Sequence, residues 1–221
     1  MFAADRDLLV HEPGLFSRVR FAAQSLLGPV EGSLDAGGTT LLLATGDAVA
    51  AGVGAGSVAV LAGLGEVEVT EVLGSQTLIV SRLRASVGGV AVSPSEGAWS
   101  GVVSVSTFGP QIALVHRSLL GLLGVREGDA PAGGGDAGVV YESQLVDTGS
   151  WARVEALGAL YLVLSAAAVS KRADDPLWRS AVRFGEAFDR ARDGLVARID
   201  LDGDGEAEAA RPMAAHQLKR G

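Results

Sequence analysis

Glu66-Val67-Glu68-Val69-Thr70 is the stretch that decides the fold. Polar and apolar residues alternate along it, and a period of two predicts a β-strand with one face in water and the other on a core. Glu71 breaks the alternation, so we expect the strand to end or bulge there. Five more short β-prone runs are separated by Gly, Ser, Pro or Asp: 39–44, 57–62, 77–83, 89–92 and 101–108. Together the six runs predict a small β-barrel or a two-sheet sandwich.

Helical periodicity is found on both sides of this β block. Asp5 or Asp7 can cap a short helix that ends near Pro13. Apolar residues then recur at three- and four-residue spacing in 15–27, 110–123, 151–170 and 175–199. In the last segment Asp175 is a candidate N-cap, with proline at the first helical position. A helix cannot bury its apolar stripe alone, so we expect these helices to pack on one another. The sequence therefore predicts an α+β protein, a helical bundle with an inserted small β-barrel or β-sandwich domain.

The predicted organisation has four regions. Residues 1–33 are the N-terminal part of the helical bundle, and residues 34–108 are the inserted β domain. Residues 109–199 are the C-terminal part of the bundle. Residues 200–221 are an acidic Asp/Gly turn followed by a basic tail.

Composition excludes several classes of function. The chain has 221 residues, 48% of them hydrophobic, with no cysteine and a net charge of −8. The absence of cysteine excludes a thiolate metal site. The negative net charge makes the protein a poor candidate for binding the phosphates of nucleic acid. The uncharged runs 48–65 and 97–115 are interrupted by glycine and serine, so we predict no membrane span.

A calcium-type motif follows the last helical segment. Asp200, Asp202 and Asp204 occupy positions one, three and five of an EF-hand-type loop, with glycine at six and Glu208 at nine. Position twelve is Arg211 instead of a bidentate glutamate. Two interpretations stay open: a calcium site with these four carboxylates as ligands, or an acidic terminator of the helix. No other cofactor is predicted.

Catalytic signatures are not found in the sequence. The three histidines are far apart, and His116 is interpreted as a structural histidine on an apolar helix face. The glycine-rich run 52–59 precedes β-prone residues, whereas a dinucleotide fingerprint needs a following helix. We therefore predict no catalytic residue and no enzymatic activity.

Two further segments are candidates for protein contacts. Residues 177–199 carry a charge-balanced face that is either solvated or a subunit interface, and the interface candidates are Arg179, Arg183, Glu186, Asp189, Arg190 and Asp193. The basic end of the chain is either disordered or a docking segment that orders on a partner. Its candidate residues are Arg211, Pro212, Met213, His216, Leu218, Lys219 and Arg220.

Three stretches carry a family resemblance. The chain begins with Asp-Arg-Asp-Leu-Leu at residues 5–9 and Glu-Pro-Gly-Leu-Phe at 12–16, and its last helical segment closes with Ile-Asp-Leu-Asp-Gly-Asp-Gly at 199–205 before the short basic end. In this order the features resemble the head-to-tail connector (adaptor, neck) proteins of tailed bacteriophages and gene transfer agents. The β block departs from the simplest helical adaptors.

The resemblance implies a virion structural protein. It implies a homo-oligomeric, twelve-subunit ring beneath the portal protein, made in the host cytoplasm and located in the virion neck. The basic tail would dock on the portal, and a downstream neck or tail protein would bind the opposite face. DNA would pass through the acidic channel without specific binding.

Two other functions share part of this evidence. One is a calcium-dependent binding module in which the β domain holds a ligand. The other is a different tail or baseplate component of a virion. The first predicts that calcium stabilises the protein, whereas the second is not separable from a connector by sequence.

Overall fold

The computed structural model describes residues 1–131, 138–169, 171–172 and 174–213. The chain is mixed α+β and divides into two compact units. One unit comprises residues 4–109, and the other comprises residues 110–221 together with residues 1–3.

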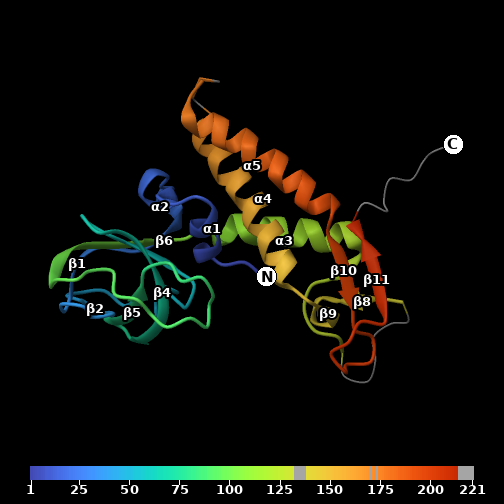
Figure 1. Ribbon diagram of the computed structural model, residues 1–221, viewed down its shortest axis with the longest axis horizontal. Helices are drawn as coiled ribbons and strands as arrows, with labels where there is room; N and C mark the ends of the chain where they lie inside the picture. Colours follow the sequence, from blue (N-terminus) through green and yellow to red (C-terminus); the bar gives the residue numbers. More distant parts are fainter. Residues whose placement is uncertain (132–137, 170, 173, 214–221) are drawn as a thin grey trace. The chain divides into compact units, whose positions relative to one another are not determined.

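The first unit is a closed antiparallel barrel of six strands in the order β1-β2-β5-β4-β3-β6 (Figure 1). Of the two predicted β architectures, the structure therefore has the barrel. The strands are β1 (Ser25–Leu34), β2 (Thr40–Leu43), β3 (Val58–Leu61), β4 (Gly65–Gly74), β5 (Thr77–Ser81) and β6 (Trp99–Ser106).

The Glu66–Thr70 stretch lies in β4, as predicted. Val67 and Val69 are buried in the barrel core, and the pairing of β4 with β5 shifts register between Val69 and Glu71, which confirms the expected bulge. Glu68 departs from the prediction because it is fully buried instead of facing water. Its burial depends on two arginines, described below.

The predicted short helix ending near Pro13 is confirmed, whereas the predicted helix over residues 15–27 is wrong. The structure has α1 (Asp5–His11), α2 (Leu15–Arg18) and a 3-10 turn, η1 (Ala22–Gln24), before β1 starts at Ser25. β1 pairs with both β2 and β6 and so closes the barrel. The predicted strand at 89–92 is not formed; those residues lie in the loop between β5 and β6.

The second unit combines three long helices with two small sheets. The helices are α3 (Gly109–Leu123), α4 (Gly149–Ala168) and α5 (Pro176–Asp193). One sheet has the order β11-β10-β9, with β9 at Leu145–Val146, β10 at Val196–Ile199 and β11 at Ala209–Pro212; the other pairs β7 (Val125–Arg126) with β8 (Val140–Tyr141).

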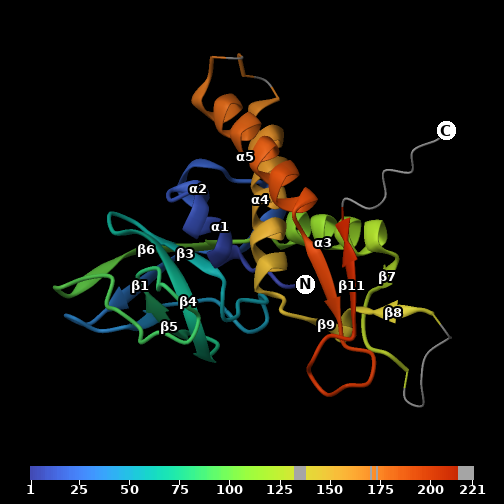
Figure 2. The same ribbon diagram turned by 45° about the vertical axis from the view of Figure 1, so that its right-hand side comes forward.

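Helices α4 and α5 lie side by side and α3 packs across them (Figures 1 and 2). Gly158 of α4 allows this close approach, because a Cβ there would lie 2.8 Å from both Val115 of α3 and Phe188 of α5. Asp175 caps α5 by accepting a hydrogen bond from the Leu177 N–H at 2.8 Å, as predicted from Asp-Pro. The predicted bundle with residues 15–27 is not confirmed, since those residues belong to the barrel unit.

The last helix is shorter than predicted. α5 ends at Asp193 with Gly194 as its C-cap, and the next residues form β10, which pairs with β11 as an antiparallel hairpin. The burial of Val196–Ile199 alternates between exposed and buried, the pattern of a strand instead of a helix. The Asp/Gly string is therefore a hairpin loop and not a helix terminator (Figure 2).

Helix α4 is long and apolar enough to cross a membrane, and it is the single helix of this kind in the described part of the chain. Its most apolar window is 61% buried inside the protein. It carries Trp151 and Val154 into the core of its unit. A helix that is mostly buried in a protein core can have the same length and apolar composition as a membrane span.

Candidate functional site

The Asp/Gly loop gathers the carboxylates that the sequence predicted as metal ligands. Asp200, Asp202, Asp204 and Glu208 each place a carboxylate oxygen within 4.8 Å of the others. The strands β10 and β11 position them, because the loop between these strands must reverse the chain direction within a few residues. Left-handed backbone at Gly203 (φ 85°) and Gly205 (φ 89°) provides the reversal.

Hydrogen bonds inside the loop hold the carboxylates. Asp200 accepts from the Gly203 N–H at 2.6 Å and from the Gly205 N–H at 2.8 Å, and Glu208 accepts from the Leu201 N–H at 2.6 Å. The hydrogen bonds from the two glycine amides lower the pKa of Asp200 below its usual value, against an opposing effect of burial. Asp200 is therefore ionised at neutral pH and can act as an oxygen ligand.

The donor set fits a hard divalent cation such as calcium, which prefers carboxylate and carbonyl oxygens. The loop departs from the EF-hand pattern at position twelve, where Arg211 replaces the bidentate glutamate. Arg211 lies in β11, and its Nη1 donates to the Leu123 carbonyl at 3.2 Å, so it faces helix α3 instead of the loop. A cation would be held by the four carboxylates, with remaining positions taken by backbone carbonyls or water.

The six residues predicted for a subunit interface are exposed, and all lie on α5. Glu186 and Arg190 are one turn apart with 3.8 Å between Oε2 and Nη1, and Asp189 pairs with Arg192 at 3.1 Å. Exposed pairs of this kind contribute little to stability. The same helix also exposes Trp178 and Val182, whose accessible fractions are 41% and 46%.

The predicted docking tail is divided by the structure. Arg211 and Pro212 are strand residues of β11, and Met213 is buried in the core of the second unit. These three residues are therefore part of the folded unit and not of a free segment. His216, Leu218, Lys219 and Arg220 lie outside the described residues.

A buried polar network, which the sequence did not reveal, ties the start of the chain to the second unit. Glu155 of α4 accepts from the N–H groups of Phe2 at 2.9 Å and Ala3 at 2.8 Å, and its other oxygen lies 2.6 Å from Nδ1 of His116. The Phe2 ring packs against His116 and Trp151. His116 is buried on its helix face, where its Nδ1 has Glu155 as partner.

Glu142 adds a second carboxylate to this network. Its Oε1 accepts from the terminal ammonium of Met1 at 2.8 Å and lies 3.2 Å from Nε2 of His116, without hydrogen-bond geometry to that nitrogen. Burial alone would raise the pKa of Glu142. The hydrogen bonds from the ammonium and from the Gly128 N–H, together with the charge of His116, outweigh burial and lower it.

The barrel unit has its own buried ionic cluster. Glu68 of β4 is fully buried and accepts from Nε of Arg6 at 2.6 Å, while its other oxygen accepts from Arg84. Arg6 also donates to the Arg84 carbonyl at 2.8 Å. Two guanidinium groups thus satisfy one carboxylate and join α1 to the barrel wall, a structural role.

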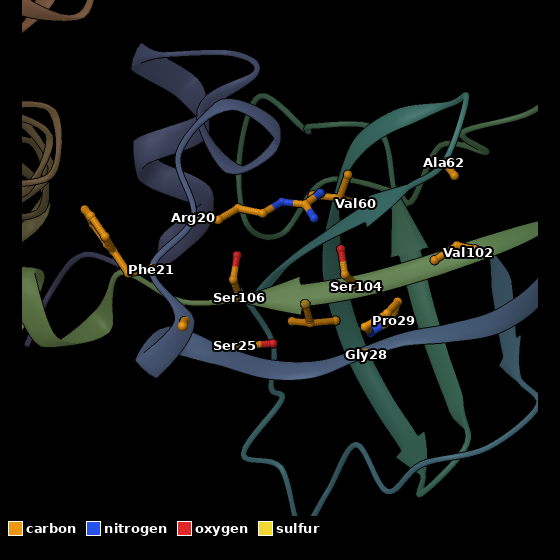
Figure 3. A pocket seen from close by; sticks show the side chains of 12 residues that line it. Arg20, Phe21, Ser25, Gly28, Pro29, Val60, Ala62, Val102, Ser104 and Ser106 are labelled. Carbon is orange, nitrogen blue, oxygen red and sulfur yellow. The ribbon is translucent and has the colours of Figure 1, made fainter. Parts of the chain in front are cut away.

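A groove of about 270 Å³ lies on the outer wall of the barrel (Figure 3). Its floor is formed by outward-facing residues of β1, β3 and β6, among them Val60, Val102 and Ser104, and Phe21 stands at one end. Arg20 extends across it and is the only charged residue of the lining. No hydrogen bond or ion pair of Arg20 is found within the described residues.

The two ring nitrogens of His116 face glutamates, and none of the described serines or threonines is hydrogen-bonded to this histidine. Comparison with protein-family models, with curated proteins and with solved structures found no match to this chain.

Proposed function

We propose that the protein is a virion structural component, a head-to-tail connector whose copies assemble into a ring beneath the portal and join the capsid to the tail. The resemblance of residues 5–16 and 199–205 to connector proteins motivates the proposal. The observation that carries it is the outer face of α5, which exposes an aromatic and an apolar residue among charges of both signs.

This face has the composition of a protein interface. Trp178 and Val182 are one turn apart, and Arg179, Arg183 and Glu186 lie next to them on the same helix. Tryptophan and arginine are the residues that most often dominate binding energy at interfaces, and interspersed charges specify register. A single copy leaves this apolar area in water, whereas a neighbouring copy would cover it.

The acidic surface supports passage of DNA without adhesion. The chain has a net charge of −8, so a ring of twelve copies would carry about −96 before counterions. Binding of duplex DNA needs cations that replace condensed counterions. A channel lined by this protein would repel the phosphates and let DNA slide.

Oligomeric state tests the proposal. Native mass spectrometry and electron microscopy of the purified protein, alone and with a portal protein, should show closed rings of about a dozen subunits. Trp178→Ala should reduce ring formation, while Leu73→Ala, a change at an exposed apolar residue of the barrel unit, should not. A protein that stays monomeric both alone and with the portal would overturn the connector assignment.

The Asp/Gly loop favours a second function, a calcium-dependent binding module built on the barrel. Four carboxylates within 4.8 Å of one another are the supporting observation. Millimolar calcium should then raise the melting temperature, with no rise for a variant in which Asp202 and Asp204 are asparagines. A ring that forms equally with calcium and with a chelator would separate assembly from metal binding.

A further inference from the structure

We propose that the Asp/Gly hairpin loop of one copy docks into the Arg20 groove on the barrel of a second copy. The inference rests on the proposed function, because it names the contact that would join neighbouring subunits of a ring. It uses two surfaces of the same chain, and each has a feature that the single chain leaves without a partner.

The groove is apolar with one unneutralised cation. Val60, Val102 and Pro29 are among its apolar lining residues, and Ser104 and Ser106 add hydroxyls. Arg20 lies over these residues in Figure 3, and acidic side chains are not among those that line the groove. A matching ligand must therefore combine a small apolar group with negative charge.

The hairpin loop has this combination. Leu201 is 54% exposed at the loop, although it is a large aliphatic residue, and carboxylates lie on both sides of it. Asp202 and Asp204 are exposed. Hydrogen bonds from two glycine amides to the Asp200 carboxylate fix the shape of the loop, so little conformational entropy would be lost on docking.

Size supports the match. The four carbons of a leucine side chain occupy roughly 120 Å³ if each takes about the volume of a water molecule. The groove of about 270 Å³ accommodates this side chain and leaves room for a carboxylate beside Arg20. Val60 and Val102 would then contact Leu201, and the guanidinium would pair with Asp202 or Asp204.

The symmetry of such a contact suits a ring. The hairpin and the groove are different surfaces, so each copy would use its hairpin on one neighbour and offer its groove to the other. Heterologous contacts of this kind generate closed rings when the rotation closes. The contact is weak when it acts alone, and closure of the ring strengthens it through effective concentration.

Disulfide trapping tests the contact directly, because the natural chain has no cysteine. Leu201→Cys and Ser104→Cys are made in separate chains, mixed and oxidised, so that a cross-link can form only between copies. We expect a cross-linked dimer band from this mixture. Ser33→Cys, on an outward position of β1 outside the groove lining, replaces Ser104→Cys in the control mixture.

The outcomes separate this contact from the proposed function. A cross-link no faster than in the control mixture, from a protein that still forms rings, would overturn the contact and leave the ring standing. A fast cross-link from a protein that forms no ring would support the contact and overturn the connector assignment.

Charge exchange gives a second test. Arg20→Glu should weaken association about 5- to 10-fold at low salt, and adding Asp202→Arg in the same chain should restore part of it. Arg82→Glu, at an exposed arginine outside the groove, is the control and should have no effect. Leu201→Ala should weaken association about 10- to 100-fold. Equal affinity of Arg20→Glu and Arg82→Glu would count against the contact.

Discussion

Asp5 makes the barrel unit less stable at neutral pH than in mild acid. Its carboxyl is 6% exposed, and it accepts a hydrogen bond from the Phe108 N–H at 2.8 Å. Burial raises the pKa of Asp5 from 3.8 to about 6, against the opposing effects of the hydrogen bonds from Phe108 and Thr107. Between these two pKa values, the Asp5 carboxyl therefore keeps its proton in the folded state, whereas it has mostly lost it in the unfolded chain.

The magnitude follows from linkage. A group whose pKa is raised in the folded state contributes its stability fully below the unfolded pKa, and this contribution is lost as pH rises through the folded pKa. A shift from 3.8 to about 6 corresponds to about 3 kcal/mol in total, and about 2.4 kcal/mol of it is lost between pH 4 and pH 7.5. Asp5→Asn keeps the acceptor for the Phe108 N–H but cannot ionise, so it should remove the loss.

The assay is the difference in free energy of unfolding between wild type and Asp5→Asn, measured by urea titration from pH 4 to pH 7.5. Hydrogen exchange of β6 peptides assigns the effect to the barrel unit. The stability of the variant relative to the wild type should increase by about 2.4 kcal/mol from pH 4 to pH 7.5. Asp35→Asn, at an exposed loop residue, is the control. A difference between wild type and Asp5→Asn that does not change with pH would refute the reasoning.

Three further predictions concern other sites. Glu68→Ala leaves two guanidinium groups without their buried carboxylate and should cost about 3–5 kcal/mol in urea unfolding of the barrel unit; a cost below 1 kcal/mol would contradict the role of the cluster. Gly158→Ala overpacks the helix contact and should lower the melting temperature of the second unit, whereas Gly121→Ala, with open space around it, should raise it or leave it unchanged. Asp200→Ala should speed amide exchange at the two glycines that donate to it, and unchanged protection there would show that the loop is held by other contacts.

Local pattern predicted most of the elements correctly. Five of the six β-prone runs lie on or next to barrel strands, and α3, α4 and α5 start within two residues of their expected positions. These elements are specified by hydrophobic periodicity and by start signals such as Asp175-Pro176, and both are properties of residues that are close in sequence. A local pattern is therefore sufficient to find them.

The barrel strand that the local pattern did not predict is β1. Ser25–Leu34 contains Gly28 and Pro29, and its pairing shifts register twice along β6. These irregularities remove the period-two signal, while Leu26 and Leu27 complete a helical stripe with residues upstream. Only the pairing of this strand with both β2 and β6 makes it a strand, and that pairing is non-local.

The end of α5 shows that a local signal was present but was outweighed. Leu195 and Ile199 continue the four-residue spacing of the helix, yet Gly194 is a stop signal and Val196 to Ile199 alternate. An Asp-Gly turn between two short β-prone runs is also a hairpin signature.

This correction changes the role of the acidic loop. A helix terminator would leave its carboxylates along a flexible exit, whereas a hairpin presents Leu201 and its flanking carboxylates on a fixed turn. The recognition surface proposed for assembly therefore follows from the same strand pairing that the helical interpretation missed.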